Sequence, residues 1–310
     1  MKIYSELSNE DYHSLRDHIS SSFVKNVAKH SIAKALEKTE PTPALIFGDA
    51  MHTYFEDTQK FKERFTIFDD SKIIAEILER RPDITVPTMT KEYKTYKKKF
   101  EQDLDPDKMV LSQDDFEKIH YMYKSSVDNT ALQEIYDDHI HTDIWDEYSF
   151  VTEDEDDWGL LYRVRPDRLL VLNNIPIAAI DWKSCRDASE KAFRTDFWRF
   201  RYDLQAAFYC DILQIPMDQF FYVAIEKEFP YNSAVFSLDE DTQQKAYREL
   251  ELIKERIGKW KENPSPQTVG LANANTITYL RAKTTQNLEN LPTDTILQAK
   301  TFSRTLARNL

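Results

Sequence analysis

The spacing of hydrophobic residues predicts helices in the first half of the chain, and strands together with helices in the second half. Apolar residues three and four apart in the first half predict helical segments over about 22–37, 44–56 and 61–138. Short apolar runs bounded by turn residues predict strands over about 144–151, 160–165, 175–180 and 220–225. Helical spacing returns over about 203–213 and 239–261. We therefore expect an α/β fold with a central mixed β-sheet flanked by helices and a largely helical N-terminal half.

The stretch from Val164 to Ser184 predicts a β-hairpin with an unusual set of charges. A first strand ends in Arg165-Pro166-Asp167, a turn follows at Asn173-Asn174, and a second strand ends in Asp181-Trp182-Lys183. Side chains two apart on a strand point to the same face, so Asp181 and Lys183 lie together, and strand pairing brings Asp167 near them. An ordinary hairpin explains the apolar pattern alone. Two carboxylates and an ammonium at one sheet edge are costly to hold together unless a metal ion and a phosphate complete the charge balance.

The length of 310 residues suits one large domain with a sizeable core. We assign residues 1–266 to it, with a helical part at about 12–138, a sheet core at about 144–225 and a last helix at about 239–261. Residues 267–310 are polar and rich in threonine and asparagine, which predicts a peripheral C-terminal tail or arm. No apolar run approaches the roughly 18 residues of a membrane span, and the first residues lack the apolar core of a signal peptide. The two cysteines, Cys185 and Cys210, suit a reducing compartment, so we expect a soluble cytoplasmic protein without membrane contact.

The charge of the chain limits how it can bind nucleic acid. The net charge of −13 argues against a general coat of basic residues, although it leaves room for a local basic groove. The one dense basic patch, Lys91–Lys99, is interleaved with tyrosines. A solvated helix face is the favoured explanation of this patch, and a sequence-independent contact with a nucleic-acid backbone is the alternative. The four glycines are not spaced as phosphate-binding loops, which argues against ATP- or NAD-dependent chemistry.

Several residues have an ordinary structural explanation beside a functional one. The serines at 20–22 fit a helix N-cap, or alternatively a contact with a DNA phosphate. His52, taken alone, fits a hydrogen-bonded core histidine better than a metal ligand. His139 and His141 have a spacing that could chelate a metal on a strand, but a solvent-exposed loop is the favoured explanation.

The acids and the lysine of the hairpin favour phosphodiester hydrolysis. Asp167, Asp181 and the main-chain carbonyl of Trp182 are hard oxygen ligands of the kind that suit Mg²⁺. Lys183 would orient or help deprotonate the attacking water and offset the charge that develops on the phosphate. The metal would lower the pKa of that water.

Three sequence blocks in the second half carry a resemblance to a known superfamily. The triplet RPD, the triplet DWK whose aspartate follows Asp167 by fourteen positions, and the block QAAFY resemble the PD-(D/E)XK nucleases, and among them the RecB-type and phage-type exonucleases. In the first half, YH, ISSSF and PALIFGDAMH are similar to the exonuclease VIII C-terminal nuclease family of phages and prophages. The blocks extend from about Tyr12 to Ile225, and residues 60 to 140 match no motif. The D-x-K element alone is a weak signal, whereas all the blocks in order are a strong one.

The resemblance implies a role for particular residues. His52, Asp167 and Asp181 match the metal-binding side chains, with Glu147 as a further acid. Lys183 matches the catalytic lysine, and Gln205 with Tyr209, four apart on one helix face, match the pair that supports the site and contacts DNA. Contacts with DNA are expected from Ser22, Arg165, Ser184 and Arg201.

The resemblance also implies an activity. The enzyme would degrade one strand of linear double-stranded DNA from its 5′ end and leave a 3′ overhang for a single-strand annealing protein. It would need Mg²⁺ or Mn²⁺ and no ATP, and it would form a homo-oligomeric ring around the DNA. An endonuclease or a single-strand nuclease of the same superfamily is the first alternative. A non-catalytic DNA-binding or anti-host interaction protein on the same fold is the second.

Overall fold

The computed structural model of the protein describes residues 1–37 and 42–264. Contacts within the chain define two units, Met1–Leu271 and Ala272–Leu310, and the described residues all belong to the first. The predicted tail at 267–310 lies outside the described residues. None of the helices in the described part of the chain is long and apolar enough to cross a membrane.

The N-terminal half is mainly helical, as its hydrophobic pattern predicts. The predicted helix over 22–37 is in fact two helices, because Ser31 takes an extended conformation and its hydroxyl accepts a 3.2 Å hydrogen bond from the Lys34 N–H at the start of the second helix. The elements of this half are β1 (Lys2–Tyr4), α1 (Asn9–Ser14), β2 (His18–Ile19), α2 (Ser21–Lys29), α3 (Ile32–Ala35), α4 (Pro43–Glu56), α5 (Thr58–Arg64), β3 (Phe65–Phe68), α6 (Ser71–Arg80), the 3₁₀ turn η1 (Pro87–Met89), α7 (Lys91–Gln102), β4 (Met109–Ser112), α8 (Gln113–Val127) and α9 (Thr130–Asp138).

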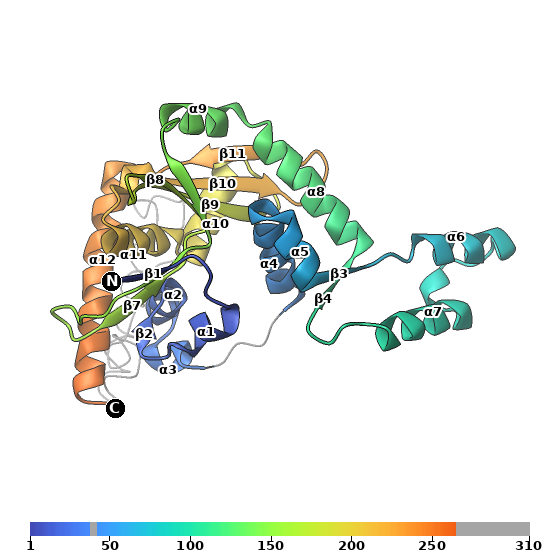
Figure 1. Cartoon of the computed structure of the whole chain (residues 1–310), viewed down its shortest axis with the longest axis horizontal. Helices are drawn as coiled ribbons and strands as arrows, with labels where there is room; N and C mark the ends of the chain where they lie inside the picture. The colour runs from blue at the N-terminus through green and yellow to red at the C-terminus, as the bar shows by residue number, and fades with distance from the viewer. Residues whose placement is uncertain (38–41, 265–310) are drawn as a thin grey trace, which may run out of the picture. The chain divides into compact units, whose positions relative to one another are not determined.

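The second half contains the central sheet and three further helices, α10 to α12 (Figure 1). The predicted strand over 144–151 is two strands in different sheets, because the backbone turns at Glu147, whose φ is 56°. The elements of this half are β5 (Asp143–Asp146), β6 (Ser149–Val151), β7 (Leu161–Val164), β8 (Arg168–Leu172), β9 (Ile175–Cys185), α10 (Glu190–Phe200), α11 (Tyr202–Leu213), the 3₁₀ turn η2 (Met217–Gln219), β10 (Phe220–Glu226), β11 (Ser233–Phe236) and α12 (Glu240–Glu262).

The predicted hairpin exists, but its first strand is not the predicted one. The strand before Asp167, β7, belongs to a four-stranded sheet with β1, β6 and β2, whereas β9 pairs with β8, which starts directly after Asp167. Pro166 lacks an N–H group and has a fixed φ, which accounts for the break between β7 and β8. The turn is at Asn173-Asn174 as predicted, and both residues have a positive φ (53° and 64°), as a two-residue hairpin turn requires.

The central sheet is mixed, with strand order β11-β10-β9-β8-β5. The middle strand, β9, runs parallel to β10 and antiparallel to β8. Its residues alternate between two hydrophobic cores, so that Ala178, Ile180 and Trp182 face one core while Ala179 and Cys185 face the other. Asp181 and Lys183 therefore share the second face.

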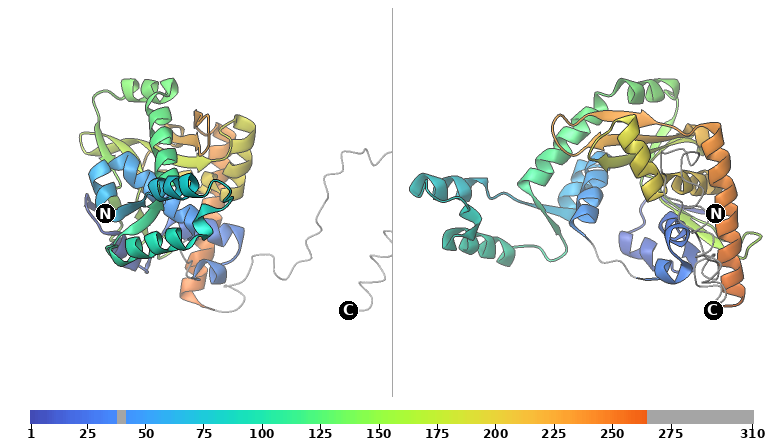
Figure 2. Two further views of the ribbon diagram at one scale, coloured as in Figure 1. Left: turned by 90° about the vertical axis from the view of Figure 1, so that its right-hand side faces the viewer. Right: turned by 180° about the vertical axis from the view of Figure 1, so that it is seen from behind.

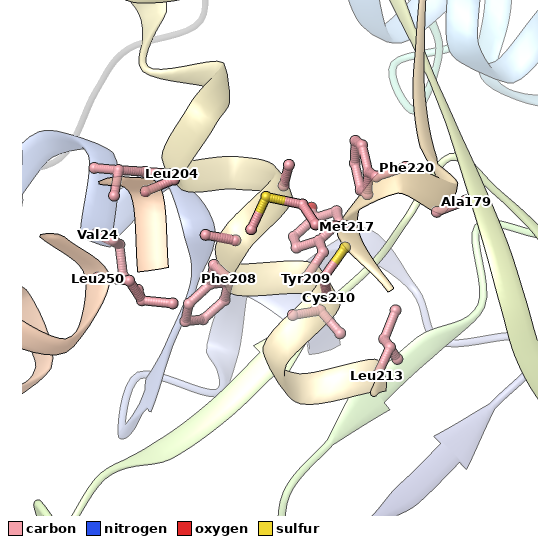
Figure 3. Packing of buried hydrophobic residues seen from close by; sticks show 14 of the residues in the cluster. Val24, Ala179, Leu204, Phe208, Tyr209, Cys210, Leu213, Met217, Phe220 and Leu250 are labelled. Atoms are coloured by element: carbon pink, nitrogen blue, oxygen red, sulfur yellow. The ribbon is translucent and has the colours of Figure 1, made fainter. Parts of the chain in front are cut away.

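Different helices cover the two faces of the sheet. Helices α4 and α8 supply Met51 and Met122 to the core that contains Trp182. Helices α2, α11 and α12 supply Val24, Leu204 and Leu250 to the other core, around Phe208 and Phe220 in Figure 3. The face of β9 that carries Asp181 and Lys183 thus lies under α11 and α2.

A helical projection, defined here as residues 69–108, extends from a small two-stranded ribbon. Strands β3 and β4 form this ribbon and pair in parallel, from Phe65 opposite Met109 to Phe68 opposite Ser112. Helices α6 and α7 lie in the connection between them and project away from the central sheet (Figures 1 and 2).

Candidate active site

Strand β9 places an aspartate and a lysine side by side beneath helix α11. Asp181 is only 1% exposed, and its Oδ2 forms an ion pair with the ammonium of Lys183. The amide nitrogen of Gln205, from α11, donates a hydrogen bond to Oδ1 of the same carboxylate. Both oxygens of Asp181 thus have a cationic or donor group beside them, which lowers the cost of burying the charge.

Asp167 lies at the start of β8 and is close to both β9 and α4. Its Oδ2 accepts a 2.9 Å hydrogen bond from the Trp182 N–H and lies 3.1 Å from Nδ1 of His52. Because the N–H and C=O of one strand residue point to the same side, the Trp182 carbonyl is directed toward Asp167 as well. The indole of Trp182 anchors this part of β9, since it packs 5.8 Å from the ring of Phe55 and carries the Arg168 guanidinium 4.9 Å from its centre.

The turn at Glu147 brings a third acid to this site. The N–H of Glu147 donates a 3.1 Å hydrogen bond to the carbonyl of Asp167, so the two residues are linked through the main chain as well. His52, Glu147 and Asp167 each offer one ligand atom, and these atoms all lie within 4.8 Å of one another. Asp181 lies outside this group of three.

The charges of the site perturb one another strongly. Burial lowers the pKa of His52, but the charge of Asp167 and its hydrogen bond together outweigh burial and raise the pKa to about 9. For Asp167, burial raises the pKa, but the charge and hydrogen bond of His52, together with the charge of Lys183 and the Trp182 N–H, hold the pKa below its usual range. Burial and the charge of Asp167 raise the pKa of Glu147 to about 8 and that of Asp181 to about 6. Burial lowers the pKa of Lys183, but the charges of Asp181 and Asp167 together keep it above its usual range.

These groups fit a divalent cation. Nδ1 of His52 and Oδ2 of Asp181 are buried and lack a hydrogen bond of acceptable geometry, although each has an oppositely charged neighbour. Carboxylate oxygens, an imidazole and a main-chain carbonyl are ligand types that Mg²⁺ and Mn²⁺ accept. The raised pKa values of Glu147 and Asp181 indicate that these carboxyl groups do not ionise readily together with Asp167. A bound metal ion would supply the positive charge that allows them to ionise.

Comparisons with known proteins agree with this geometry. Residues 20–277 match the model of the PDDEXK-like domain of unknown function, DUF3799. The chain belongs to this family. A crystal structure of a "putative exonuclease" from Eubacterium rectale has the same fold, with a TM-score of 0.52, 13% sequence identity, and coverage of 90% of this chain and 96% of that one. No curated protein matches the chain. The expected PD-(D/E)XK nuclease fold is thereby confirmed, and the family supports a nuclease, whereas a specific relation to exonuclease VIII stays a prediction.

In this PDDEXK-like domain, the residues of the QxxxY pair have different neighbours. Gln205 faces Asp181, while the hydroxyl of Tyr209 donates a 3.2 Å hydrogen bond to the main-chain carbonyl of Arg165. Burial raises the pKa of Tyr209 well above its ordinary value, so the phenol stays protonated. Tyr209 therefore helps to hold the segment that leads from β7 to Asp167.

Sequence reasoning missed one residue of the site, Lys25 of α2. Its Nζ donates a 3.0 Å hydrogen bond to Oε1 of Gln205 and lies 5.8 Å from the ring centre of Tyr202, over which Lys183 is also placed, at 5.1 Å. Burial and the charge of Lys183 lower the pKa of Lys25 to about 8. No sequence signal distinguishes this lysine, because lysines commonly flank the apolar stripe of a helix.

A cleft of about 750 Å³ opens beside Lys25. Its lining comes from α1, α2, α4 and β4, with Phe200 from the end of α10 and Tyr202 from the start of α11. The lining residues used below are Lys25, Lys29, Phe200, Tyr202 and Met109. The combination of ammonium groups with aromatic rings is typical of a groove for a nucleic-acid strand.

The four residues predicted to contact DNA differ in their surroundings. Ser22 is exposed in the first turn of α2 and lines the cleft, and Ser184 is half-buried on β9. The guanidinium groups of the two arginines have internal partners: Arg165 donates to Ser149, Asn9 and the carbonyl of Leu7, and Arg201 donates to Asp203 and Glu249. These partners favour a structural role for both arginines, and their contact with DNA stays a prediction.

The two histidines with a possible chelating spacing, His139 and His141, take no part in the site. Nδ1 of His139 lies 2.7 Å from the carbonyl of Ile135 at the end of α9, and His141 is exposed in the loop that follows. Within residues 1–37 and 42–264, the one group of three or more potential metal ligands is the one formed by His52, Glu147 and Asp167.

Proposed function

We propose that the protein is a metal-dependent exonuclease that hydrolyses linear double-stranded DNA from the 5′ end and leaves a 3′ overhang. The observation that carries the proposal is the pairing of two groups at the end of β9. One is the His52, Glu147 and Asp167 cluster, and the other is the connected set of Lys183, Asp181, Gln205 and Lys25. The first fits a cation, and the second includes two ammonium groups, of which that of Lys25 lines a cleft open to solvent.

The residues of the site have distinct tasks in this reaction. His52, Asp167, Glu147 and Asp181, with the Trp182 carbonyl, would hold Mg²⁺ or Mn²⁺. When bound, such an ion acts as a Lewis acid and lowers the pKa of a coordinated water. Charge on the metal would compete with Lys183 for the carboxylate of Asp181.

Lys183 would then act on the substrate. Its ammonium would orient the attacking water and offset the negative charge that develops on the phosphate oxygens. Gln205, through its amide N–H, keeps the Asp181 carboxylate in one orientation, and Lys25 keeps the amide of Gln205 from rotating, because it binds the amide oxygen.

The cleft supports DNA as the substrate. Lys25 and Lys29 would contact phosphates, and the exposed ring of Phe200 would stack on a base, without reading its sequence. The preference for ends and the 5′ to 3′ polarity rest on the sequence blocks shared with phage-type exonucleases. A partnership with a single-strand annealing protein, a ring-shaped homo-oligomer and a cytoplasmic location belong to the same proposal.

The test is digestion of linear duplex DNA that carries a label at the 5′ or the 3′ end, with Mg²⁺, by the wild type and by Lys183→Gln. The glutamine keeps an N–H donor toward Asp181, so loss of activity with an unchanged unfolding transition would reflect chemistry rather than misfolding. We expect early release of the 5′ label by the wild type alone. A covalently closed circle should resist digestion, and cutting of the circle would establish an endonuclease instead.

A further inference from the structure

The three aromatic residues of the helical projection each make a contact with the segment that joins β3 to α6 or with the end of β3. The hydroxyl of Tyr93 donates a 2.6 Å hydrogen bond to Asp70, and that of Tyr96 donates a 2.9 Å bond to the main-chain carbonyl of Asp69. The ring of Phe100 lies 4.8 Å from that of Phe68. Tyr93, Tyr96 and Phe100, three and four positions apart, thus define the face of α7 that packs against α6 and the end of β3.

Three lysines occupy the opposite side of α7. At 100° per residue, Lys91, Lys94 and Lys98 follow one another along a stripe that faces away from the packed tyrosines. All three side chains are exposed. We call this set the lysine stripe.

The lysine stripe has no acidic partner among the described residues. The two glutamates of α7 bind other cations, since Glu92 pairs with Arg81 at 3.0 Å and Glu101 lies 3.9 Å from Lys97. No ion pair of the described segments includes Lys91, Lys94 or Lys98. In a chain of net charge −13, three neighbouring ammonium groups without a carboxylate are an uncompensated positive surface.

The position and spacing of the lysine stripe fit a nucleic-acid backbone. From Lys91 to Lys98 the helix rises about 10 Å, which corresponds to about three phosphates along one strand of duplex DNA. Strand β4, which directly follows the projection, contributes Met109 to the wall of the cleft that contains Lys25 and Lys29. The projection therefore starts where the cleft ends.

We propose that the lysine stripe of α7 binds the phosphate backbone of the double-stranded part of the substrate, outside the cleft and independently of base sequence. This inference rests on the proposed function, because it assigns a second contact to the same DNA. It separates the tasks of the two surfaces: the cleft positions the strand to be cut, and α7 retains the duplex between successive cuts. Contact with phosphates also explains why no carboxylate neutralises the stripe, since an internal ion pair would compete with DNA.

The experiment compares two variants that lose the same charge. The first is Lys91→Gln, Lys94→Gln and Lys98→Gln together. The control is Lys2→Gln, Lys245→Gln and Lys259→Gln together, three lysines on other elements that lie beside Glu153, Asp239 and Glu255. Binding of a fluorescent blunt-ended duplex is measured without divalent metal across a range of salt concentrations, and hydrolysis of a long and a short duplex is measured with Mg²⁺.

We expect the stripe variant to reduce the slope of log K against log salt by about 2 to 3, because each lost phosphate contact removes about 0.9 from it. It should release a long duplex after fewer cuts, while its rate on saturating short duplex and its unfolding transition match the wild type. The control should bind as the wild type does. Equal slopes in both variants would overturn the inference.

The same measurements separate this inference from the function on which it rests. If the wild type cuts DNA but the stripe variant keeps the full salt slope, only the role of α7 is wrong. If the stripe variant binds DNA normally but sediments as a smaller species than the wild type, the stripe binds a second copy of the chain instead. If the wild type neither binds nor cuts DNA, the proposed function fails first.

Discussion

Lys25 and Gln205 lie 180 positions apart in the chain, and Nζ of the lysine is 3.0 Å from Oε1 of the glutamine. The same glutamine donates its amide nitrogen to Asp181. An amide that accepts at one end and donates at the other has a single stable orientation, so Lys25 determines how Gln205 presents its N–H. The N-terminal helix α2 therefore contributes to a site whose Asp181 and Lys183 come from strand β9.

The first prediction concerns this contact. Lys25→Met should lower kcat on linear duplex by about 10- to 100-fold, because a hydrogen bond to a charged group contributes about 1.5–3 kcal/mol. Lys25→Arg keeps the charge and a donor and should recover part of the loss. Initial rates at several DNA concentrations separate kcat from KM.

Lys29→Met is the matched control for Lys25, since Lys29 lies one turn further along α2 and lines the same cleft without a hydrogen bond to Gln205. It should raise KM and leave kcat nearly unchanged. A normal kcat in Lys25→Met would mean that Gln205 keeps its orientation without the lysine.

The second prediction concerns metal binding by the folded protein, measured without any DNA. Mg²⁺ or Mn²⁺ at about 100 times its Kd should stabilise the wild type by about 2.7 kcal/mol against unfolding. Asp167→Asn should abolish this gain, because Asp167 faces His52 and Glu147 in the cluster. Asp154→Asn, which changes an exposed carboxylate outside the cluster, should retain it. Calorimetric titration checks the affinity directly.

The third prediction concerns pH. In the folded, metal-free protein the pKa values of His52, Glu147 and Asp181 are raised to about 9, 8 and 6, above unfolded values of about 6.5, 4.3 and 3.9. Each group binds its proton more tightly in the folded protein than in the unfolded chain. Its contribution to the free energy of unfolding is therefore complete below the pKa of the unfolded state and is lost as the pH rises through the pKa of the folded state. Stability in EDTA should therefore fall from about pH 5 to pH 9.

Urea unfolding at intervals across this window measures the effect. Asp167, whose pKa is lowered on folding, acts in the opposite direction and only at the acid end, where its contribution is lost as the pH falls. Glu147→Gln should flatten the decline, because the amide cannot ionise. Stabilisation by Mg²⁺ should grow with pH, since the ion replaces the protons. Metal-free stability that rises between pH 5 and 9 would contradict the prediction.

The fourth prediction distinguishes structure from DNA contact at Arg201. Its guanidinium binds Asp203, whose side chain is only 3% exposed, and also binds Glu249 of α12. Arg201→Ala should cost about 3–5 kcal/mol in denaturant unfolding, because it leaves a buried charge without its partner. Arg199→Ala, two positions earlier and exposed, should cost less than about 1 kcal/mol. A stable Arg201→Ala with a reduced salt slope for DNA would support the DNA contact instead.

Much of the fold follows from the sequence because its local signals agree with one another. The period of two along β9 and the Asn173-Asn174 turn predict a hairpin that the structure contains. The strand that pairs with β9 was not predictable in the same way. Both β7 and β8 are apolar runs of the right length, and only the break at Pro166 shows which of them pairs with β9.

The sequence predicts the site residues that belong to a recognisable motif. It does not predict the residues that only tertiary packing brings to the site. His52 has no local signal of metal binding, and only its place in the block PALIFGDAMH suggested the cluster with Asp167 that the structure contains. Lys25 belongs to no motif, and its bond to Gln205 depends on how α2 packs on α11. Glu147 was expected inside a strand, but it reaches Asp167 because the strand is interrupted at that residue.

The parallel pairing of β3 and β4 has a consequence for how this protein can be shortened. Antiparallel strands can be joined by two residues, whereas parallel strands need a crossover of a dozen or more, because the chain must return to the starting end of the ribbon. Helices α6 and α7 occupy that crossover. Deletion of the whole projection would therefore break the ribbon and disturb the cleft wall at Met109, while removal of whole helical turns from both helices would leave the connection intact. The length of the helical projection can therefore vary, but a connection of this kind between β3 and β4 is required by their parallel pairing.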